Sequence, residues 1–364
     1  MLGLRRPSVR RRAPASCAAP APYSARHSLL SKALTCPETA VMTQATEASR
    51  EAPWIPRSDR RGQLAALLGL GGLLYWLCRF HPSAMPVWAP WDFSWPEYLA
   101  FALTILWFFR GLADTPPEAR PSLARRVAFF SGLALTYAVM QTHFDYMAQH
   151  MFFLNRIQHV VMHHVGPFLI ALGLAGGTIR RGMPAPLRRM AGSRPVGLTI
   201  RVLQQPAVAV ILFVGLFYFW LIPPVHFRAM IDPRLYVVMN ASMVLDGLLF
   251  WSLVLDPRPR PPARVSFGAR FALAVVVMFP QIALGAVITF SQHDLYPYYD
   301  LCGRLFPSID ALDDQQIGGI VMWIPPAMMS VTAALLVLNA LRIHEESAEG
   351  NSRGLSANAT LANR

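Results

Sequence analysis

The sequence predicts an all-α fold, a polytopic transmembrane helix bundle of about eight spans with both termini cytoplasmic. Hydrophobic residues make up 54% of the 364 residues and charged residues only 15%, whereas soluble domains carry about 25% charged residues. Apolar runs recur along the chain and are long enough to cross a hydrocarbon core of about 30 Å as helices. Arginines gather in alternate segments between these runs.

The predicted spans are separated by short polar segments. They lie near residues 62–80, 97–115, 126–148, 151–176, 203–223, 235–255, 268–291 and 315–341. Arg110 interrupts the second span, which is therefore the weakest of the set. Together these segments form a transmembrane helical domain predicted over residues 62–342.

The arginines also predict the orientation of the spans. They fill the segment before the first span and the second, fourth and sixth loops, whereas the other loops are poorer in arginine and hold tryptophans and tyrosines. Arginine-rich loops are typically cytoplasmic, which puts both termini on the cytoplasmic side. A formal charge of +13 could indicate nucleic-acid binding. Its distribution between apolar spans argues against that interpretation.

The two ends of the chain lack apolar periodicity. Residues 1–61 are rich in Arg, Pro, Ala and Ser, and such a segment cannot bury enough apolar surface to fold. We expect a disordered basic tail there, in which Met42 is an alternative start of the chain. No signal-peptide apolar region follows its basic start. Residues 343–364 are predicted to form a disordered C-terminal tail.

A segment rich in histidine and methionine is the main candidate for a metal site. His159 and His163 are spaced i, i+4 and so share one face of a helix, with Met162 close by. Imidazole and thioether ligands suit copper better than zinc or magnesium. We therefore expect copper in a shallow, outward-facing site made from His150, His159, Met162, His163 and Met322. The alternative is that these histidines are interfacial residues bonded to backbone carbonyls or water.

Polar residues also lead directly into the last apolar run. Asp313, Asp314, Gln315 and Gln316 precede a stretch with no further charge until Arg342, and polar groups entering hydrocarbon are costly and often functional. Asp314 shares a helical stripe with Gly318 and Met322 because the three are spaced i, i+4, i+8. The alternative is that Asp314 and Asp313 only cap this helix.

Asp246 lies near the middle of the sixth predicted span, where an unpaired carboxylate costs at least a few kcal/mol. We expect it to be protonated or paired with a group such as His164 or an arginine. Its role is open between a structural hydrogen bond and a proton or metal function. Glycines of the late spans are interpreted as close helix-packing positions: Gly247, Gly285, Gly318 and Gly319.

Several motifs resemble those of the CtaG family, multi-span assembly factors for cytochrome c oxidase. The most specific is Asp314-Gln315-Gln316 with Gly319, Met322, Trp323 and Pro325. Further similarities are Gln158-His159 leading to Pro167-Phe168-Leu169 and Gly173, Gly247-Leu248-Leu249-Phe250-Trp251, and Leu284-Gly285-Ala286 followed by Tyr296-Pro297 and Tyr299. The resemblance covers residues 60–345. Asn155 and Asn240 depart from it, because many members have a histidine at those positions.

The resemblance implies a non-enzymatic, multi-pass assembly factor of the bacterial inner membrane. Its partners would be the catalytic subunit of cytochrome c oxidase or other assembly factors within the lipid bilayer. We expect it to present copper to that subunit on the periplasmic side. Residues with other expected functional roles are Asp246, Asp314, Gln315, Gln316 and Trp323. The alternatives are a b-type haem-binding electron carrier and a proton-coupled transporter that uses Asp246.

Overall fold

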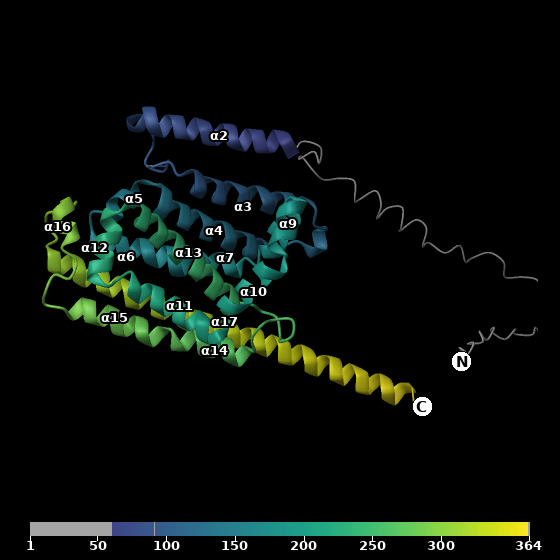
Figure 1. Cartoon of the computed structure of the whole chain (residues 1–364). Coiled ribbons are helices and arrows are strands. Elements are labelled where there is room, and N and C mark those ends of the chain that lie inside the picture. Colours follow the sequence, from purple (N-terminus) through teal and green to yellow (C-terminus); the bar gives the residue numbers. More distant parts are fainter. Residues whose placement is uncertain (1–59, 91, 363–364) are drawn as a thin grey trace, which may run out of the picture. The chain divides into compact units, whose positions relative to one another are not determined.

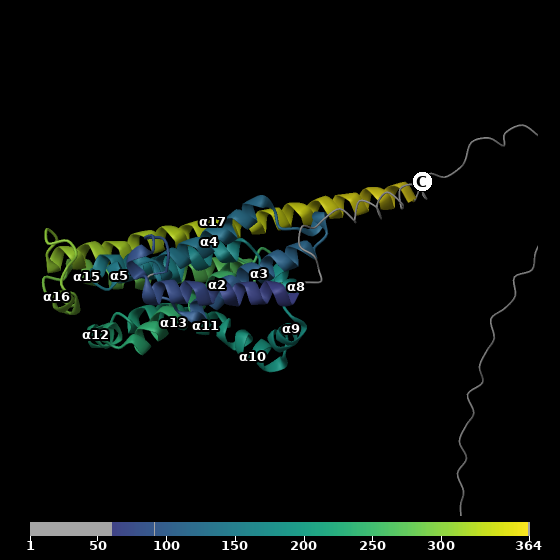
Figure 2. The same cartoon turned by 90° about the horizontal axis from the view of Figure 1, so that it is seen from above.

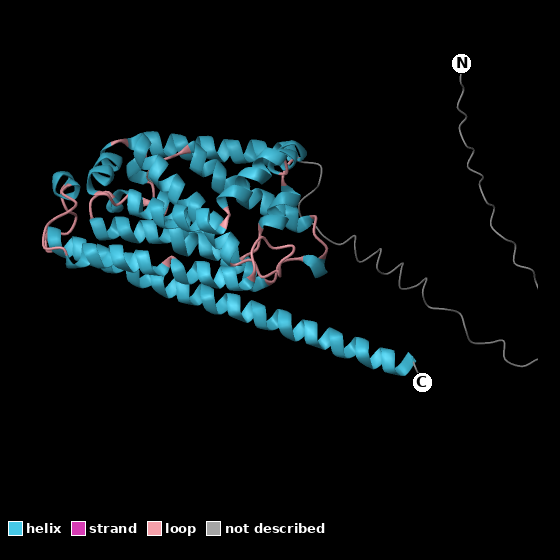
Figure 3. Cartoon of the chain, turned by 60° about the horizontal axis from the view of Figure 1, so that its bottom comes forward, coloured by secondary structure: helices cyan, strands magenta, loops and turns pink. Residues whose placement is uncertain are grey.

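The computed structural model describes residues 60–90 and 92–362, and every regular element in these ranges is a helix (Figure 3). The all-α fold class predicted from the sequence is therefore confirmed. The predicted N-terminal tail lies outside the described residues apart from Arg60 and Arg61, and so does Met42.

Most predicted spans correspond to one helix or to two helices in series. The long single helices are α2 (Arg60–Phe80), α3 (Trp95–Ala113), α4 (Leu123–Gln141), α11 (Pro206–Phe219), α13 (Pro233–Val254) and α17 (Ala311–Ala362). The fourth span is composite, with α6 (Phe152–Val160), the π-helical turn η3 (Val161–Val165) and α7 (Gly166–Leu172). The seventh consists of α14 (Phe267–Val276) and α15 (Met278–Phe290).

Short helices connect these spans. They are α5 (His143–Ala148), α8 (Gly176–Gly182), α9 (Ala185–Ala191), α10 (Arg194–Leu203), α12 (Pro223–Ile231) and α16 (Tyr298–Cys302), with the 3₁₀ turns η1 (Pro82–Ala84) and η2 (Pro117–Ala119). We call the end of the bundle where α6 and α17 begin the Asp314 end. The opposite end, where α7 and α13 finish, is the arginine-rich end.

The helices are those of a membrane protein. Among the described residues, five helices are long and apolar enough to cross a membrane, and the number rises to seven if each of two bent pairs is one span. The pairs are Phe152–Leu172 with α8, bent by 77°, and α10 with α11, bent by 71°. α3 has 19 residues but is not among these candidates, because Glu97, Arg110 and its tryptophans lower its mean hydropathy. The predicted number of eight and the orientation stay predictions.

Glycines allow the closest helix contacts, as the sequence predicts. A Cβ added at Gly247 of α13 would lie 2.4 Å from the carbonyl oxygen of His163. A Cβ added at Gly318 of α17 would lie 2.4 Å from the ring of Phe152 on α6. Such distances are far below van der Waals contact, so the two positions fix how closely α13 and α17 approach the α6–η3 segment.

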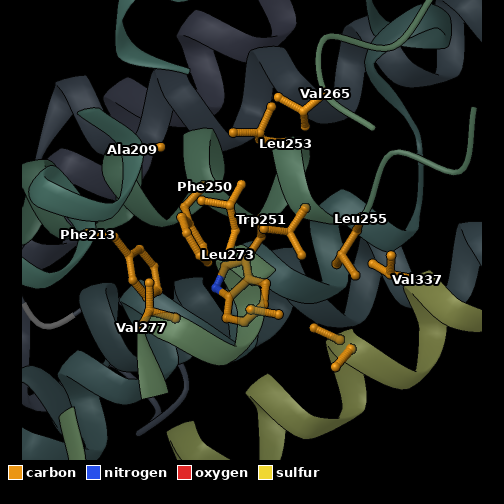
Figure 4. Close-up of a cluster of buried hydrophobic side chains, with 14 of the residues drawn as sticks. Ala209, Phe213, Phe250, Trp251, Leu253, Leu255, Val265, Leu273, Val277 and Val337 are labelled. Atoms are coloured by element: carbon orange, nitrogen blue, oxygen red, sulfur yellow. The ribbon is translucent and has the colours of Figure 1, made fainter. Parts of the chain in front are cut away.

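A cluster of buried apolar side chains also holds α11, α13, α14 and α17 together (Figure 4). The rings of Phe213 and Phe250 stack with centroids 3.9 Å apart. Nε1 of Trp251 donates a hydrogen bond of 3.2 Å to the carbonyl oxygen of His163. Because a π-helical turn departs from the regular ladder of hydrogen bonds, this indole supplies a donor to η3 from the neighbouring helix.

α17 packs along α15 and α14 and then continues past them to Ala362 (Figures 1 and 2). The sequence predicts a disordered tail over 343–364, but residues 343–362 are helical in the structure. No proline follows Pro326 in this helix, and Arg342 and Glu346 form an i,i+4 ion pair of 3.6 Å. Both features favour continued helix beyond the bundle.

The predicted orientation can be tested with reporter fusions. A reporter after Arg188 of α9 should report the cytoplasm, and one after Arg304, near the start of α17, should report the outer side. The reason is the arginine alternation, which places cytoplasmic loops at the arginine-rich end. Paired alkaline phosphatase and fluorescent protein fusions give the readout. Two fusions that report the same side would contradict the orientation.

Candidate functional site

Asp314 joins the last helix to the start of α6. Its carboxylate accepts hydrogen bonds from the backbone N–H groups of Phe152, at 2.9 Å, and Phe153, at 2.8 Å. The first N–H groups of a helix lack partners within the helix and carry the positive end of its dipole, so a carboxylate stabilises them. Arg304 pairs with the same carboxylate. The polar start of the last span therefore meets the start of the fourth span.

The capping of α17 itself differs from the prediction. The backbone N–H of Asp313 donates to Oδ1 of Asp310 at 2.8 Å, so Asp310 serves the start of α17, while the Asp313 residue is exposed. Asp314 acts as a cap, but for another helix. A sequence pattern that shows only neighbours along the chain cannot reveal this, because the capped groups lie on α6.

Gln315 ties α17 to the end of α15 and the segment that follows it. Its Oε1 accepts from the backbone N–H of Leu295 at 2.7 Å, and its Nε2 donates to the carbonyl oxygens of His293 at 3.1 Å and Ile288 at 3.3 Å. All of these partners are backbone groups, so they indicate a positioning role. Gln316 is half-buried, and Trp323 packs against Gly285.

One face of the α6–η3 segment carries Phe152, Arg156, His159 and His163. The spacing i, i+4, i+7, i+11 keeps a common face over three turns. The side chains of Phe152 and Arg156 meet Gly318 of α17. Met322 lies one turn beyond Gly318 on the same stripe of α17, so this register brings it to the level of His159. His159 is 1% exposed and Met322 is fully buried.

α13 approaches the same face from another side. Tyr236 of α13 contacts Gln158 of α6, and Asp246, further along α13, contacts His163 of η3. The two segments therefore run in the same direction. Gly247 touches the His163 backbone. One turn earlier on each helix, Met243 therefore comes to the level of His159. Met243 is 1% exposed.

Asp246 has a different partner from the one expected. Nε2 of His163 lies 3.0 Å from Oδ2 of Asp246, whereas Nε2 of His164 lies 3.3 Å from Oε1 of Gln281. The π-helical turn explains the difference, because it changes which side chains of residues 161–165 face each neighbour. The sequence pattern assumes a regular helix and therefore misses it.

His159 stands apart from its neighbours because neither of its ring nitrogens has a hydrogen-bond partner although both are buried. A buried polar atom without a partner costs about 1–3 kcal/mol. Such an atom in a native fold calls for an ordered water or a ligand. Met239, Met243 and Met322 belong to one contiguous cluster of buried side chains. The helix register therefore puts an imidazole with two unpartnered nitrogens and two thioethers at about the same level of the bundle.

The other predicted ligands do not all join this group. Nδ1 of His150 bonds to the carbonyl oxygen of Tyr146 at 2.8 Å, and its ring packs on that tyrosine in the link between α5 and α6. Met162 is fully buried in η3. In the described part of the chain, no three His, Cys, Asp or Glu side chains form a group that could hold a metal ion. A metal here would therefore depend on thioethers.

Sequence reasoning missed Met243. The signal was available, because Met239 and Met243 are spaced i, i+4 and Asp246 follows three residues later on the same face of the sixth span. The spacing indicates a shared site with His159 only once α13 is known to lie beside η3. The sequence does not show this, because the two segments are far apart along the chain.

Aromatic side chains, which we call the aromatic cap, pack at the Asp314 end of α6, and His159 is 1% exposed, whereas the sequence predicts a shallow, outward-facing site. The cap consists of Phe152, His226, Tyr296 and Tyr299. The rings of Phe152 and Tyr296 stack with centroids 4.2 Å apart, and Nε2 of His226 lies 3.0 Å from the Tyr299 hydroxyl. Burial, with nearby Arg156, holds the pKa of His226 well below its ordinary value. A neutral His226 accepts from the Tyr299 hydroxyl and donates from Nδ1 to the Trp220 carbonyl oxygen at 3.2 Å.

Asp145, in the connecting helix α5, holds three elements together near this cap. It accepts hydrogen bonds from Tyr236 at 2.7 Å, Gln158 at 2.6 Å and Gln149 at 2.9 Å. Burial raises the pKa of Asp145 despite these donors. The network was not expected from the sequence, because Asp145 lies near the end of the predicted third span and its partners Gln158 and Tyr236 lie on other helices.

The Asp314 cap leads to a stability prediction. Replacing Asp314 with Ala should lower the free energy of unfolding by about 2–4 kcal/mol, because it uncaps α6 and leaves Arg304 without its buried partner. Asp313→Ala is the matched control and should change it by less than about 0.5 kcal/mol, since Asp313 is exposed. Thermal unfolding in detergent measures both. Equal effects of the two changes would contradict the capping role.

A known protein family matches the part of the chain that contains this site. A model of the family described as cytochrome c oxidase caa3 assembly factor matches residues 104–342, which include His159, Met243, Asp246, Asp314 and Met322. Comparisons with curated proteins and with solved structures give no match. The matched stretch covers well over half of the chain. The protein therefore belongs to the Caa3_CtaG family of cytochrome c oxidase assembly factors.

Proposed function

We propose that this assembly factor is not an enzyme and that it binds Cu(I) within its helix bundle and presents it to the catalytic subunit of the oxidase. The observation that carries the proposal is His159, which is buried with two unpartnered ring nitrogens at the level of Met243 and Met322. Imidazole and thioether donors together favour copper over harder ions. Holding and releasing an ion requires no catalytic step.

The charge around the site supports a monovalent ion. Arg156 lies one turn from His159, is fully buried, and donates to the side chain of Asn155. No carboxylate pairs with Arg156 among the described residues, since Asp314 is engaged by Arg304. A buried positive charge disfavours a second cation in proportion to that ion's charge. Cu(I) is therefore accepted more readily than Cu(II).

The aromatic cap defines the route of release under this proposal. Phe152, His226, Tyr296 and Tyr299 separate His159 from the Asp314 end, which the arginine pattern predicts to be the outer, periplasmic side. His226 and Tyr299 are carried by the short connecting helices α12 and α16. Rearrangement of these short helices would open the site without disturbing the spans.

The alternative of a b-type haem carrier is not favoured. Axial ligation of haem in a bundle needs histidines that face one another from different helices. The buried histidines within the described spans, His159, His163 and His164, all lie on one continuous helical run. His226 lies on α12, and both of its ring nitrogens are already bonded. Asp246, the residue required for the transporter alternative, is paired with His163.

The copper proposal predicts a specific loss of binding. His159→Ala should weaken Cu(I) binding at least about tenfold, because it removes the only imidazole with two free nitrogens among the described buried histidines. Met243→Leu with Met322→Leu should also weaken binding, while the similar side-chain volume preserves packing. Competition with a Cu(I)-specific chelator on purified protein measures the affinity. His150→Ala is the matched control and should bind as the unchanged protein does.

Oxidase assembly provides the second readout. Cells with His159→Ala and His163→Ala together should show lower assembled oxidase activity at a normal level of this protein. The level must be measured, because the loss of a buried polar partner can also unfold a bundle. Undiminished copper binding in that double variant would overturn the metal proposal. So would an absence of copper binding in the unchanged protein together with full oxidase assembly.

A further inference from the structure

A groove runs along the outer faces of α11 and α14 at the arginine-rich end of the bundle. It consists of two hollows that share Pro206, one of about 440 Å³ and one of about 460 Å³. The first is apolar and is lined by Ala207, Val210, Ile211, Ala269, Ala272 and Val276, among others. The second is lined by apolar groups together with four polar or charged side chains, Arg201, Gln204, Gln205 and Arg264. The groove thus passes from a basic head to an apolar track.

The two arginines at its head are available for a ligand. Arg201 and Arg264 are exposed, and neither side chain has a hydrogen bond or ion pair with any described residue. No carboxylate lines either hollow. Two arginines that line the same hollow without a counter-ion attract an anion, and guanidinium geometry suits phosphate. Charge complementarity therefore points to a phosphate group.

The helix that carries Arg201 indicates that the arginine-lined hollow lies at a membrane surface. α10, which carries Arg201, is bent by 71° from α11. It exposes Leu198 and Val202, which are 58% and 50% accessible, on the same short helix as its arginines. An amphipathic helix that turns away from a span in this way lies in the interface, with basic groups at headgroup level.

We propose that an anionic phospholipid occupies this groove, with its phosphate on Arg201 and Arg264 and an acyl chain along the apolar track of α11 and α14. Basic pockets between spans on the cytoplasmic side bind anionic headgroups. Ile211 and Val276 of the track are 67% and 49% exposed, so they require an apolar neighbour within a membrane. The site is separate from the one proposed for copper.

A larger hollow at the same end is a weaker candidate. It measures about 780 Å³ and lies between α4, α7 and α13, with Arg125 and Arg258 at its rim. Asp256 also lines it and pairs with Arg258 at 2.8 Å. That ion pair already neutralises one of the two cations, so the attraction for an anionic headgroup is smaller there.

Native mass spectrometry of the purified full chain tests the headgroup. Titration with phosphatidylglycerol and with phosphatidylcholine of the same acyl chains should show about tenfold tighter binding of the anionic lipid. Arg201→Gln with Arg264→Gln should abolish that preference. Arg188→Gln with Arg189→Gln is the matched control, because it removes the same charge from exposed positions of α9 and should keep the preference. All of these substitutions are at exposed positions, so thermal unfolding should be unchanged.

A second arm tests the acyl track and the source of the phosphate. Ala272→Trp fills the apolar hollow at an exposed position and should weaken the binding of both lipids. Glycerol phosphate, which has no acyl chain, should bind far more weakly than the lipid. The proposal is overturned if the two lipids bind equally, if both arginine pairs lower binding alike, or if glycerol phosphate binds as tightly as the lipid. It is also overturned if Ala272→Trp changes nothing or if a second protein chain fills the groove instead.

Discussion

The arrangement of the bundle depends on the carboxylate of Asp314 at the start of α6. Two helices that are distant in the sequence begin together because a side chain of α17 satisfies the first N–H groups of α6. That contact fixes the register, since Gly318 then meets Phe152 and Arg156 in the next turn. Within hydrocarbon, where no water can replace a lost partner, such a contact is costly to exchange for another. The same register therefore determines which residues of α6 and α17 face each other further along the two helices.

Below that contact, the polar side chains of the α6–η3 segment find partners one by one. Gln158 is held by Asp145 and Tyr236, His163 by Asp246, and His164 by Gln281. The same helical run leaves His159 without a partner on either nitrogen. Arg156, His163 and His164 each keep one buried nitrogen without a partner, but His159 differs from them because both of its ring nitrogens lack one. Under the copper proposal, the thioethers of α13 and α17 would select a soft ion.

The sequence sufficed for the fold class and for most helices, because long apolar runs and arginine spacing are properties of single segments. It sufficed for the close helix contacts at the glycines of the late spans. It could not reveal the π-helical turn at 161–165, so Asp246 was expected to be protonated or paired with a group such as His164 or an arginine, whereas its partner is His163. Met243 was missed because its relevance depends on which helix lies beside it. The helical continuation to Ala362 was missed because a polar composition does not by itself exclude helix.

His159 is 1% exposed, and this burial restricts how an ion bound to it would leave the protein. Under the copper proposal, an ion at His159 would be released only when the aromatic cap opens, whereas an ion in a shallow site would leave by simple dissociation. The cap depends on a neutral His226 that joins α12 to Tyr299 of α16, two short helices at the end of the bundle. A partner that binds these helices could therefore open the route and accept the ion in the same encounter. Coupling of release to docking would keep a reactive ion away from water until its recipient is in place. Arg156 beneath the cap would favour departure once the route is open, because it repels any cation that remains.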